Sequence, residues 1–329
     1  MKMIGHVLQA CAVCIATALT ASVVAIPAAA QIYPTKPIRL LVPFGPGGVG
    51  DITSRAVMQK MGEAMGQQII IDNRPSAGGI VATETVAKSE PDGYTLYLMN
   101  NTNAVSAAMF KKLPYDVVRD FAMVSTIGGF SLVVLVSPDS PVKSVKELIA
   151  QARANPGKFN IGSINIGTTQ HLSAELLKSM AALDAVTVPF NNTAGVLTAL
   201  RGNSVQVATE FLPPVLGQLR ANALRALAVT SLTRSPMLPN VPTLAESGLP
   251  GYEVNSWNGI AVAAKTPQAI VDRLNREIHA AVNSPLVAQR FQELGVSANL
   301  NTPEGMRKLL VDEIAKWNAL IDKAKIPRQ

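Results

Sequence analysis

Cysteine is nearly missing from this chain of 329 residues, and both copies, Cys11 and Cys14, fall within the first 30. Residues 31–329 therefore contain no disulfide, no thiolate metal ligand and no cysteine nucleophile. Aromatic residues are also scarce, at 5%. Alanine, valine, leucine and isoleucine must then fill the core, which favours strands covered by helices on both faces.

The side chains that usually perform catalysis are few. Beyond the first 30 residues, histidine occurs only as His171 and His279. His279 lies in a stretch of helical periodicity, and His171 in the first turn of another helix, where the helix dipole disfavours the imidazolium cation. No G-x-S-x-G elbow and no H-E-x-x-H spacing is present. We predict that the protein is not an enzyme and carries no metal and no cofactor.

The formal net charge is +7, but the basic residues are scattered and no basic run is interleaved with aromatics. This pattern does not indicate a nucleic-acid partner. A mildly positive field attracts small anions, although the same charge also serves solubility alone.

One long apolar stretch, residues 7–26, follows the basic Lys2. Ala28 and Ala30 then form the A-x-A pattern of a signal-peptidase site. The length of the stretch almost allows an uncleaved membrane anchor, but its polar interruptions and the A-x-A site favour a signal peptide. We predict that residues 1–30 are a signal peptide, with cleavage after Ala30 and location in the periplasm.

Strand and helix patterns alternate along the rest of the chain, which is typical of an α/β protein with a mostly parallel sheet. Helices are expected over residues 52–65 and 268–282, and after the capping box that Ser144 begins. The predicted strands cover residues 38–42, 68–71, 95–99, 132–136, 186–190, 205–209 and 224–230.

Two glycine-containing segments, residues 127–130 and 255–259, are expected to be crossings between two lobes. The first lobe is then discontinuous, with residues 31–128 and 257–329. The second lobe is predicted over residues 129–256.

A glycine-rich segment, residues 44–51 (FGPGGVGD), joins the first predicted strand to the first helix. Gly45, Gly47 and Gly50 match G-x-G-x-x-G, and Asp72 follows at the spacing of a ribose-binding acid. A dinucleotide-binding oxidoreductase is therefore an alternative. Nicotinamide and flavin cofactors are unusual in exported proteins, which argues against it. The free N–H groups at the helix start bind a carboxylate by the same physics.

A second loop of this kind, residues 160–171 (NIGSINIGTTQH), leads into a helix of the other predicted lobe. Two such loops can close on opposite sides of one ligand. Neither residues 44–51 nor 162–171 include lysine or arginine. We therefore expect a carboxylate to be held by backbone N–H groups and by the hydroxyls of Ser163 and Thr168.

Four blocks of sequence carry a resemblance to a known family. They are YPTKPI and PFGPGG within residues 33–48, DNRP at 72–75 with a glycine pair at 78–79, the loop at 162–171, and PNVPTLAE at 239–246. The mature chain resembles from end to end the substrate-binding receptors of tripartite tricarboxylate transporters, the Bug family.

The resemblance implies an α/β type II periplasmic binding-protein fold, with two lobes and the ligand cleft between them. It implies a receptor that captures a small organic carboxylate for uptake through membrane transporter subunits. We expect this receptor to be a monomer. An exported binding protein that feeds a sensor is the second alternative.

The resemblance also implies which residues bind the ligand. Two of them depart from the family pattern, since Asn192 stands where a basic residue or glycine is usual and Glu210 near where an aspartate is usual. We expect these two positions to tune which carboxylate fits. Asn191 and Asn192 are uncharged and are expected to read the far end of the ligand, which is then polar or neutral. The expected ligand-binding residues are Phe44, Gly47, Gly48, Asp51, Gly78, Asn101, Asn103, Ser163, Thr168, Thr169, His171, Asn192 and Glu210.

Overall fold

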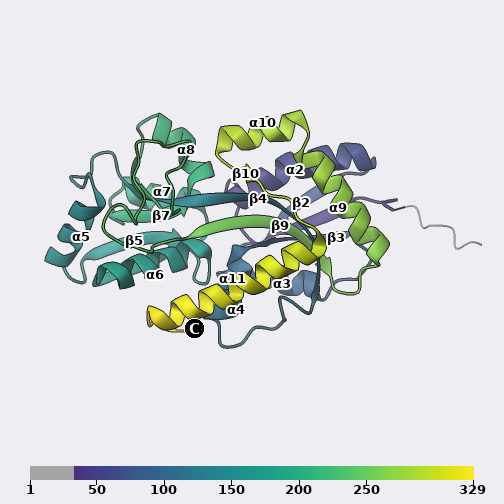
Figure 1. The fold of residues 1–329 in the computed structure, drawn as a ribbon, viewed down its shortest axis with the longest axis horizontal. Helices are drawn as coiled ribbons and strands as arrows, with labels where there is room; N and C mark the ends of the chain where they lie inside the picture. The colour runs from purple at the N-terminus through teal and green to yellow at the C-terminus, as the bar shows by residue number, and fades with distance from the viewer. Residues whose placement is uncertain (1–32) are drawn as a thin grey trace, which may run out of the picture. The chain divides into compact units, whose positions relative to one another are not determined.

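The computed structural model describes residues 33–329, and Lys36–Gln329 form one compact unit within it (Figure 1). The predicted signal peptide, residues 1–30, lies outside the described residues. Within residues 33–329, no helix combines the length and the apolar character that a membrane crossing needs.

The strands of this unit follow the order β2-β1-β3-β9-β4-β7-β5-β6, and β8 and β10 pair with β4. Pairing is parallel within β2-β1-β3 and within β7-β5-β6, and antiparallel around β4 and β9. The sheet is therefore mixed, with a parallel group on each side of an antiparallel centre. The strands are β1 (Ile38–Val42), β2 (Ile69–Asn73), β3 (Thr95–Asn100), β4 (Phe121–Val136), β5 (Phe159–Ile164), β6 (Ala185–Phe190), β7 (Val207–Phe211), β8 (Arg225–Val229), β9 (Asn255–Ala263) and β10 (Ser297–Ala298).

The two predicted crossings are parts of the long central strands β4 and β9, which run side by side in Figure 1. Residues 127–130, predicted to be a crossing between the lobes, lie within β4. The strand passes close to Val296 at Gly128. A Cβ atom on Gly128 would lie 2.7 Å from Cγ1 of Val296, so a larger residue would clash there. Gly129 pairs with Trp257, so the two crossing segments are direct neighbours.

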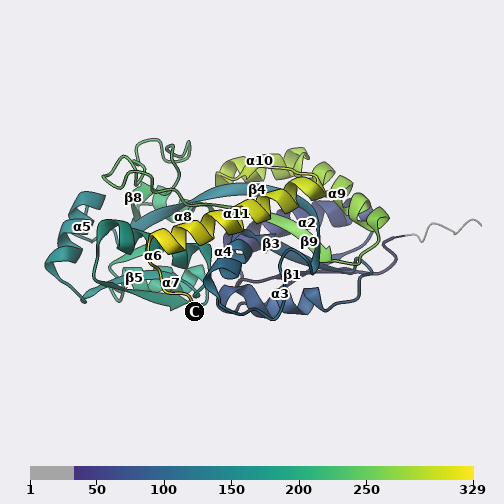
Figure 2. The same ribbon diagram turned by 60° about the horizontal axis from the view of Figure 1, so that its bottom comes forward.

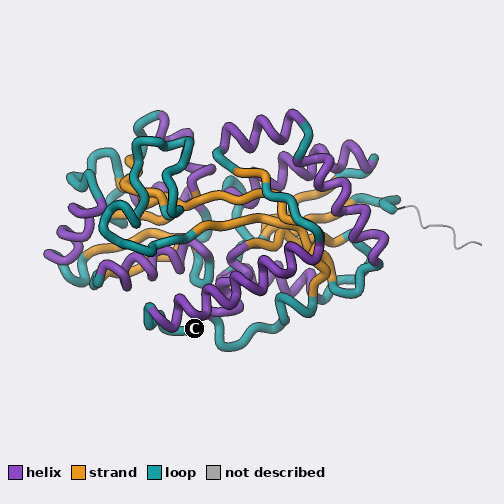
Figure 3. The backbone as a smooth tube through the Cα atoms, in the orientation of Figure 1, coloured by secondary structure: helices purple, strands orange, loops and turns teal. Residues whose placement is uncertain are grey.

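Helices cover the strands on both sides, as Figure 3 shows in purple and orange. The long C-terminal helix α11 lies along α4 and also packs on β4 (Figure 2). The helices are α2 (Val49–Met65), the 3₁₀ turn η1 (Ala77–Gly79), α3 (Ile80–Ala87), α4 (Asn101–Met109), α5 (Val145–Ala154), α6 (Thr169–Ala181), α7 (Thr193–Arg201), α8 (Leu212–Arg220), α9 (Gln268–Val282), α10 (Pro285–Leu294) and α11 (Pro303–Lys323).

Local capping signals place several helix ends. Ser144 caps α5 by accepting a hydrogen bond from the N–H of Glu147, as the capping box predicts. Thr302 caps α11 in the same way, with the N–H of Gly305 as donor. Pro267 is itself the N-cap of α9, so this helix begins at Gln268, one residue later than a proline in the first helical position would place it.

Candidate ligand-binding site

A small cavity lies where the N-terminus of α2 faces the N-terminus of α7. Its volume is about 20 Å³, which is close to the space that one water molecule occupies. Neither an acidic nor a basic side chain lines it. The lining residues are Phe44, Gly45, Gly48, Val49, Gly50, Ile164, Gln170, Asn191, Asn192, Thr193 and Phe211.

The loop before α2 brings backbone N–H groups to this cavity. Gly48 is the N-cap, and Gly47 adopts φ of +82°, a left-handed conformation that glycine tolerates best. Asp51 does not line the cavity, because its carboxylate accepts hydrogen bonds from the N–H of Gly47 (3.0 Å) and from Arg55 (2.8 Å). Burial raises the pKa of Asp51, but these hydrogen bonds outweigh burial and hold it below its ordinary value. The ionised carboxylate thus braces the loop.

The second helix start at the cavity is that of α7. Asn192 is its N-cap and accepts a hydrogen bond from the N–H of Gly195 at 2.8 Å. A Cβ atom on Gly45 would lie 3.1 Å from the Cβ of Asn192, so the two loops are in direct contact here. The sequence predicted the start of α6 opposite α2. Gln170 of α6 does line the cavity, and the start of α7 lines it as well.

The hydroxyls of Ser163 and Thr168 were expected to donate to a ligand, but both point into their own loop. Each donates to the carbonyl oxygen of Ile164, at 3.0 Å and 3.4 Å respectively. Thr168 also caps α6 by accepting from the N–H of His171 at 3.2 Å. Both side chains are buried and neither lines the cavity. They shape the loop in this structure, and a contact of their hydroxyls with a ligand stays a prediction.

A second set of contacts joins η1 and α4 to the loop before α6 and to the start of α6. The N–H of Gly78 donates to the carbonyl oxygen of Ile166 at 2.8 Å. The hydroxyl of Ser106 donates to the carbonyl oxygen of Gly167 at 3.0 Å. Nδ2 of Asn101 lies 3.4 Å from Oγ1 of Thr169. Gly78, Asn101 and Thr169, all predicted site residues, therefore link the β3–α4 side of the molecule to the start of α6.

Asn101 and Asn103 have separate roles although both follow β3. Asn101 accepts a hydrogen bond from Nε1 of Trp317 and donates to the carbonyl oxygen of Asn255, which ties α4 to α11 and to β9. Asn103 completes the capping box of α4 and bonds Thr83 and Tyr97. Its amide is occupied within its own side of the molecule, away from the cavity.

Two buried titratable groups flank the start of α6. His171 is buried, and its Nδ1 has no hydrogen-bond partner among residues 33–329. Burial lowers the pKa of His171, so its imidazole is neutral at pH 7. Glu210 is fully buried behind Gln170, and burial raises the pKa of its carboxyl. Neither group lines the cavity.

The dinucleotide alternative does not fit this geometry. Asp72, the residue at the ribose-binding spacing, forms ion pairs with Arg39 and Arg74. Gly45, within the G-x-G-x-x-G match, is packed against Asn192, as described above.

No cluster of three or more His, Cys, Asp or Glu side chains able to hold a metal occurs in the described part of the chain.

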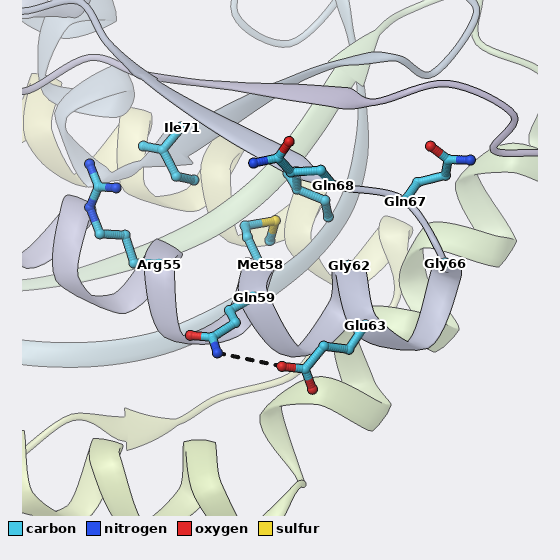
Figure 4. A pocket seen from close by; sticks show the side chains of 10 residues that line it. Arg55, Met58, Gln59, Gly62, Glu63, Gly66, Gln67, Gln68 and Ile71 are labelled. Carbon is cyan, nitrogen blue, oxygen red and sulfur yellow. Dashed lines mark hydrogen bonds between the residues drawn. The ribbon is translucent and has the colours of Figure 1, made fainter.

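A larger groove, of about 650 Å³, runs between α2 and the outer edge strand β2 (Figure 4). Arg55, Gln59 and Glu63 line it, and Gln59 donates to Glu63 at 3.4 Å. It contains none of the predicted site residues and no helix N-terminus. We therefore take the cavity between α2 and α7 as the candidate site.

Comparison with known proteins decides the family. Residues 53–326 match the tripartite tricarboxylate transporter family receptor. This chain is a member of that receptor family. The chain is 34% identical to the protein BugT of Bordetella pertussis over 300 residues, which cover 91% of this chain and 92% of that protein.

Two solved receptors from Rhodopseudomonas palustris are similar in structure. The protein Rpa4515, solved with adipate, has a TM-score of 0.86 and 33% identity, with 90% of this chain and 99% of that chain covered. MatC, solved with bound malate, has a TM-score of 0.84 and 29% identity, with 88% and 100% covered. These findings confirm the Bug-family prediction and the two-lobe α/β fold. The chain is a solute-binding receptor rather than an enzyme, and receptors of this family are periplasmic.

The sequence missed several residues of the receptor's cavity. Gln170, Thr193 and Phe211 line it but were not predicted, whereas Phe44, Gly48 and Asn192 were. Nothing in the sequence separates Gln170 from its predicted neighbours Thr169 and His171. Only the direction of its side chain on α6 makes it different.

Proposed function

We propose that this receptor captures a small organic carboxylate in the cavity between α2 and α7 and delivers it to the membrane subunits of a tripartite transporter. The main support is that two helix N-termini open on one cavity without an acidic side chain in its lining. The N–H groups of a helix start carry partial positive charge and bind anions. Malate and adipate, with which two similar proteins were solved, are both small organic carboxylates.

Each hydrogen bond to a charged group contributes about 1.5–3 kcal/mol, so a few N–H donors are enough to offset desolvation of a carboxylate. Phe44, Gly48 and Asn192 are proposed to contact the ligand. The other predicted residues hold the loops in place through the hydrogen bonds described above.

The decisive experiment is mass spectrometry of small molecules released from natively purified protein, followed by calorimetry with each candidate. Malate and adipate are the first two acids to titrate. If neither the released compounds nor the tested acids include a carboxylate that binds, the proposal is wrong.

Ligand entry requires the two sides of the cavity to separate, because about 20 Å³ is too small for any carboxylic acid. We propose that residues 31–128 with 257–329 and residues 129–256 move as two lobes about the paired crossings of β4 and β9. Small-angle scattering of the monomeric receptor should show a smaller radius of gyration with saturating ligand than without. An equal radius in both states would contradict hinge closure.

Processing is expected to remove residues 1–30. The A-x-A site at Ala28 and Ala30 follows an apolar stretch of signal-peptide type. N-terminal sequencing of exported protein should begin at Gln31 or within a few residues of it. Mature protein that retains Met1 and stays in the membrane fraction would overturn the assignment to the periplasm.

A further inference from the structure

Among the side chains that line the cavity, Gln170 is the one with a buried polar atom that has no hydrogen-bond partner in the described part of the chain. It is 3% exposed, and its Nε2 donates to Oε1 of Glu210 at 3.0 Å. Its Oε1 is buried and accepts no hydrogen bond from any described residue. A buried carbonyl oxygen without a donor is unfavourable, and most such groups in proteins are paired.

Residues of strand β7 hold both the backbone and the side chain of Gln170. Oγ1 of Thr209 donates to the backbone carbonyl oxygen of Gln170 at 2.9 Å. The next residue, Glu210, holds the side-chain nitrogen. Oε1 of Glu210 also accepts from the N–H of Phe211 at 2.8 Å, so this oxygen is an acceptor for two donors. An amide turned by 180° would place Oε1 of Gln170 against that acceptor, so the network keeps Nε2 there.

The surroundings of Glu210 are uncharged. The groups that face it are the amide of Gln170 on α6, the hydroxyl of Thr193 on α7 and the backbone of Phe211 on its own strand. The side chain is fully buried, and burial raises the pKa of its carboxyl. Glu210 does not line the cavity, so Nε2 of Gln170 is directed away from it and the free Oε1 is the end of the amide left for a ligand.

We propose that Oε1 of Gln170 accepts a hydrogen bond from the ligand, so that the receptor selects carboxylates that also carry a hydroxyl or ammonium group. This inference rests on the proposed function, because it assumes that the carboxylate binds in the same cavity. Gln170 is then a specificity-determining residue, and Glu210 is a positioning residue that acts through it.

The test compares three acids that share a four-carbon skeleton, by calorimetry with the purified mature receptor. Succinate lacks a donor, malate adds a hydroxyl and aspartate adds an ammonium group. At least one of malate and aspartate should bind about tenfold more tightly than succinate, because succinate leaves the buried oxygen unpaired. Which of the two binds better tells whether the donor is a hydroxyl or an ammonium group.

Two variants assign the preference to this network. Gln170→Met keeps the length of the side chain but removes the acceptor, so the ratio of affinities for the donor-bearing acid and succinate should fall to near one. Glu210→Ala should lower the same ratio, since the amide of Gln170 is then free to turn. Gln59→Met, at an exposed position on α2, is the matched control and should leave the ratio unchanged. A general loss of folding would weaken all acids alike and would not alter the ratio.

The outcomes separate the two proposals. If succinate binds as tightly as both other acids, or if the preference survives in Gln170→Met, the role of Gln170 is wrong while the carboxylate receptor stands. If the Gln170→Met protein does not fold, the parent ratios and the Glu210→Ala ratio still decide. If none of the three acids binds, the inference about Gln170 is wrong, whereas the proposed function fails only if the released compounds and adipate also include no carboxylate that binds.

Discussion

Asn192→Asp is expected to weaken binding of the carboxylate ligand by roughly 200-fold while leaving the fold intact. Aspartate caps a helix as well as asparagine does, so the hydrogen bond from the N–H of Gly195 is retained. The new charge, however, lies in the lining of the cavity. Two like charges about 5 Å apart repel by about 3 kcal/mol at an effective dielectric constant near 20, which corresponds to the stated loss.

Calorimetry with the identified ligand measures this loss, and thermal unfolding verifies the fold. Thr302→Asp is the matched control, because it places the same acid at the exposed N-cap of α11, away from the cavity. That variant should bind like the parent. Unchanged affinity in Asn192→Asp would mean that the carboxylate does not sit at the start of α7.

Gly167→Ala should lower ligand affinity by about 30-fold, because it prevents the two sides of the site from meeting. A Cβ atom at this position would lie 2.3 Å from Cε2 of Phe110 and 3.2 Å from Cα of Gly78. The backbones must then separate, which breaks the hydrogen bonds Gly78 N–H to Ile166 and Ser106 to Gly167. Two such bonds contribute about 2 kcal/mol together, or about 30-fold in affinity.

The residue also has φ of +80°, so alanine adds backbone strain of about 1 kcal/mol or more. Gly157→Ala controls for this strain, because Gly157 has φ of +70° but its added Cβ would meet nothing closer than 3.8 Å. Gly157→Ala should lose only the stability that the strain costs, whereas Gly167→Ala should lose more stability in thermal unfolding and should also lose affinity in calorimetry. Equal affinities in the two variants would show that this contact does not support binding.

Much of the fold was predictable because it depends on local signals. Apolar runs such as residues 38–42 became buried strands, and Ser144 capped the helix that its capping box predicted. The first half of β4 was missed because Gly128 and Gly129 interrupt its apolar pattern. Gly128 is explained by the close approach of Val296 from a distant part of the chain, which no local pattern reports.

The candidate site was likewise predictable only where its signals are local. The sequence identified the loop before α2, because a glycine-rich turn that opens a helix is a local feature. It assigned the hydroxyls of Ser163 and Thr168 to the ligand, but the loop itself uses both. The direction of a hydroxyl depends on the nearest acceptor, here the carbonyl oxygen of Ile164, and that is set by the fold of the loop.

By itself, the sequence determined the α/β class and the two glycine loops through periodicity and local motifs, and it determined the family and the receptor function through the resemblance that its four sequence blocks carry. Only the tertiary structure decided that the start of α7 lines the cavity beside α2, that Gly78 meets Gly167, and that Gln170 turns its amide towards Glu210. Each of these contacts joins segments far apart in the chain. Strand pairing and helix packing set the distances between these segments. No local stretch of sequence therefore encodes the contacts, and they form only when the chain folds.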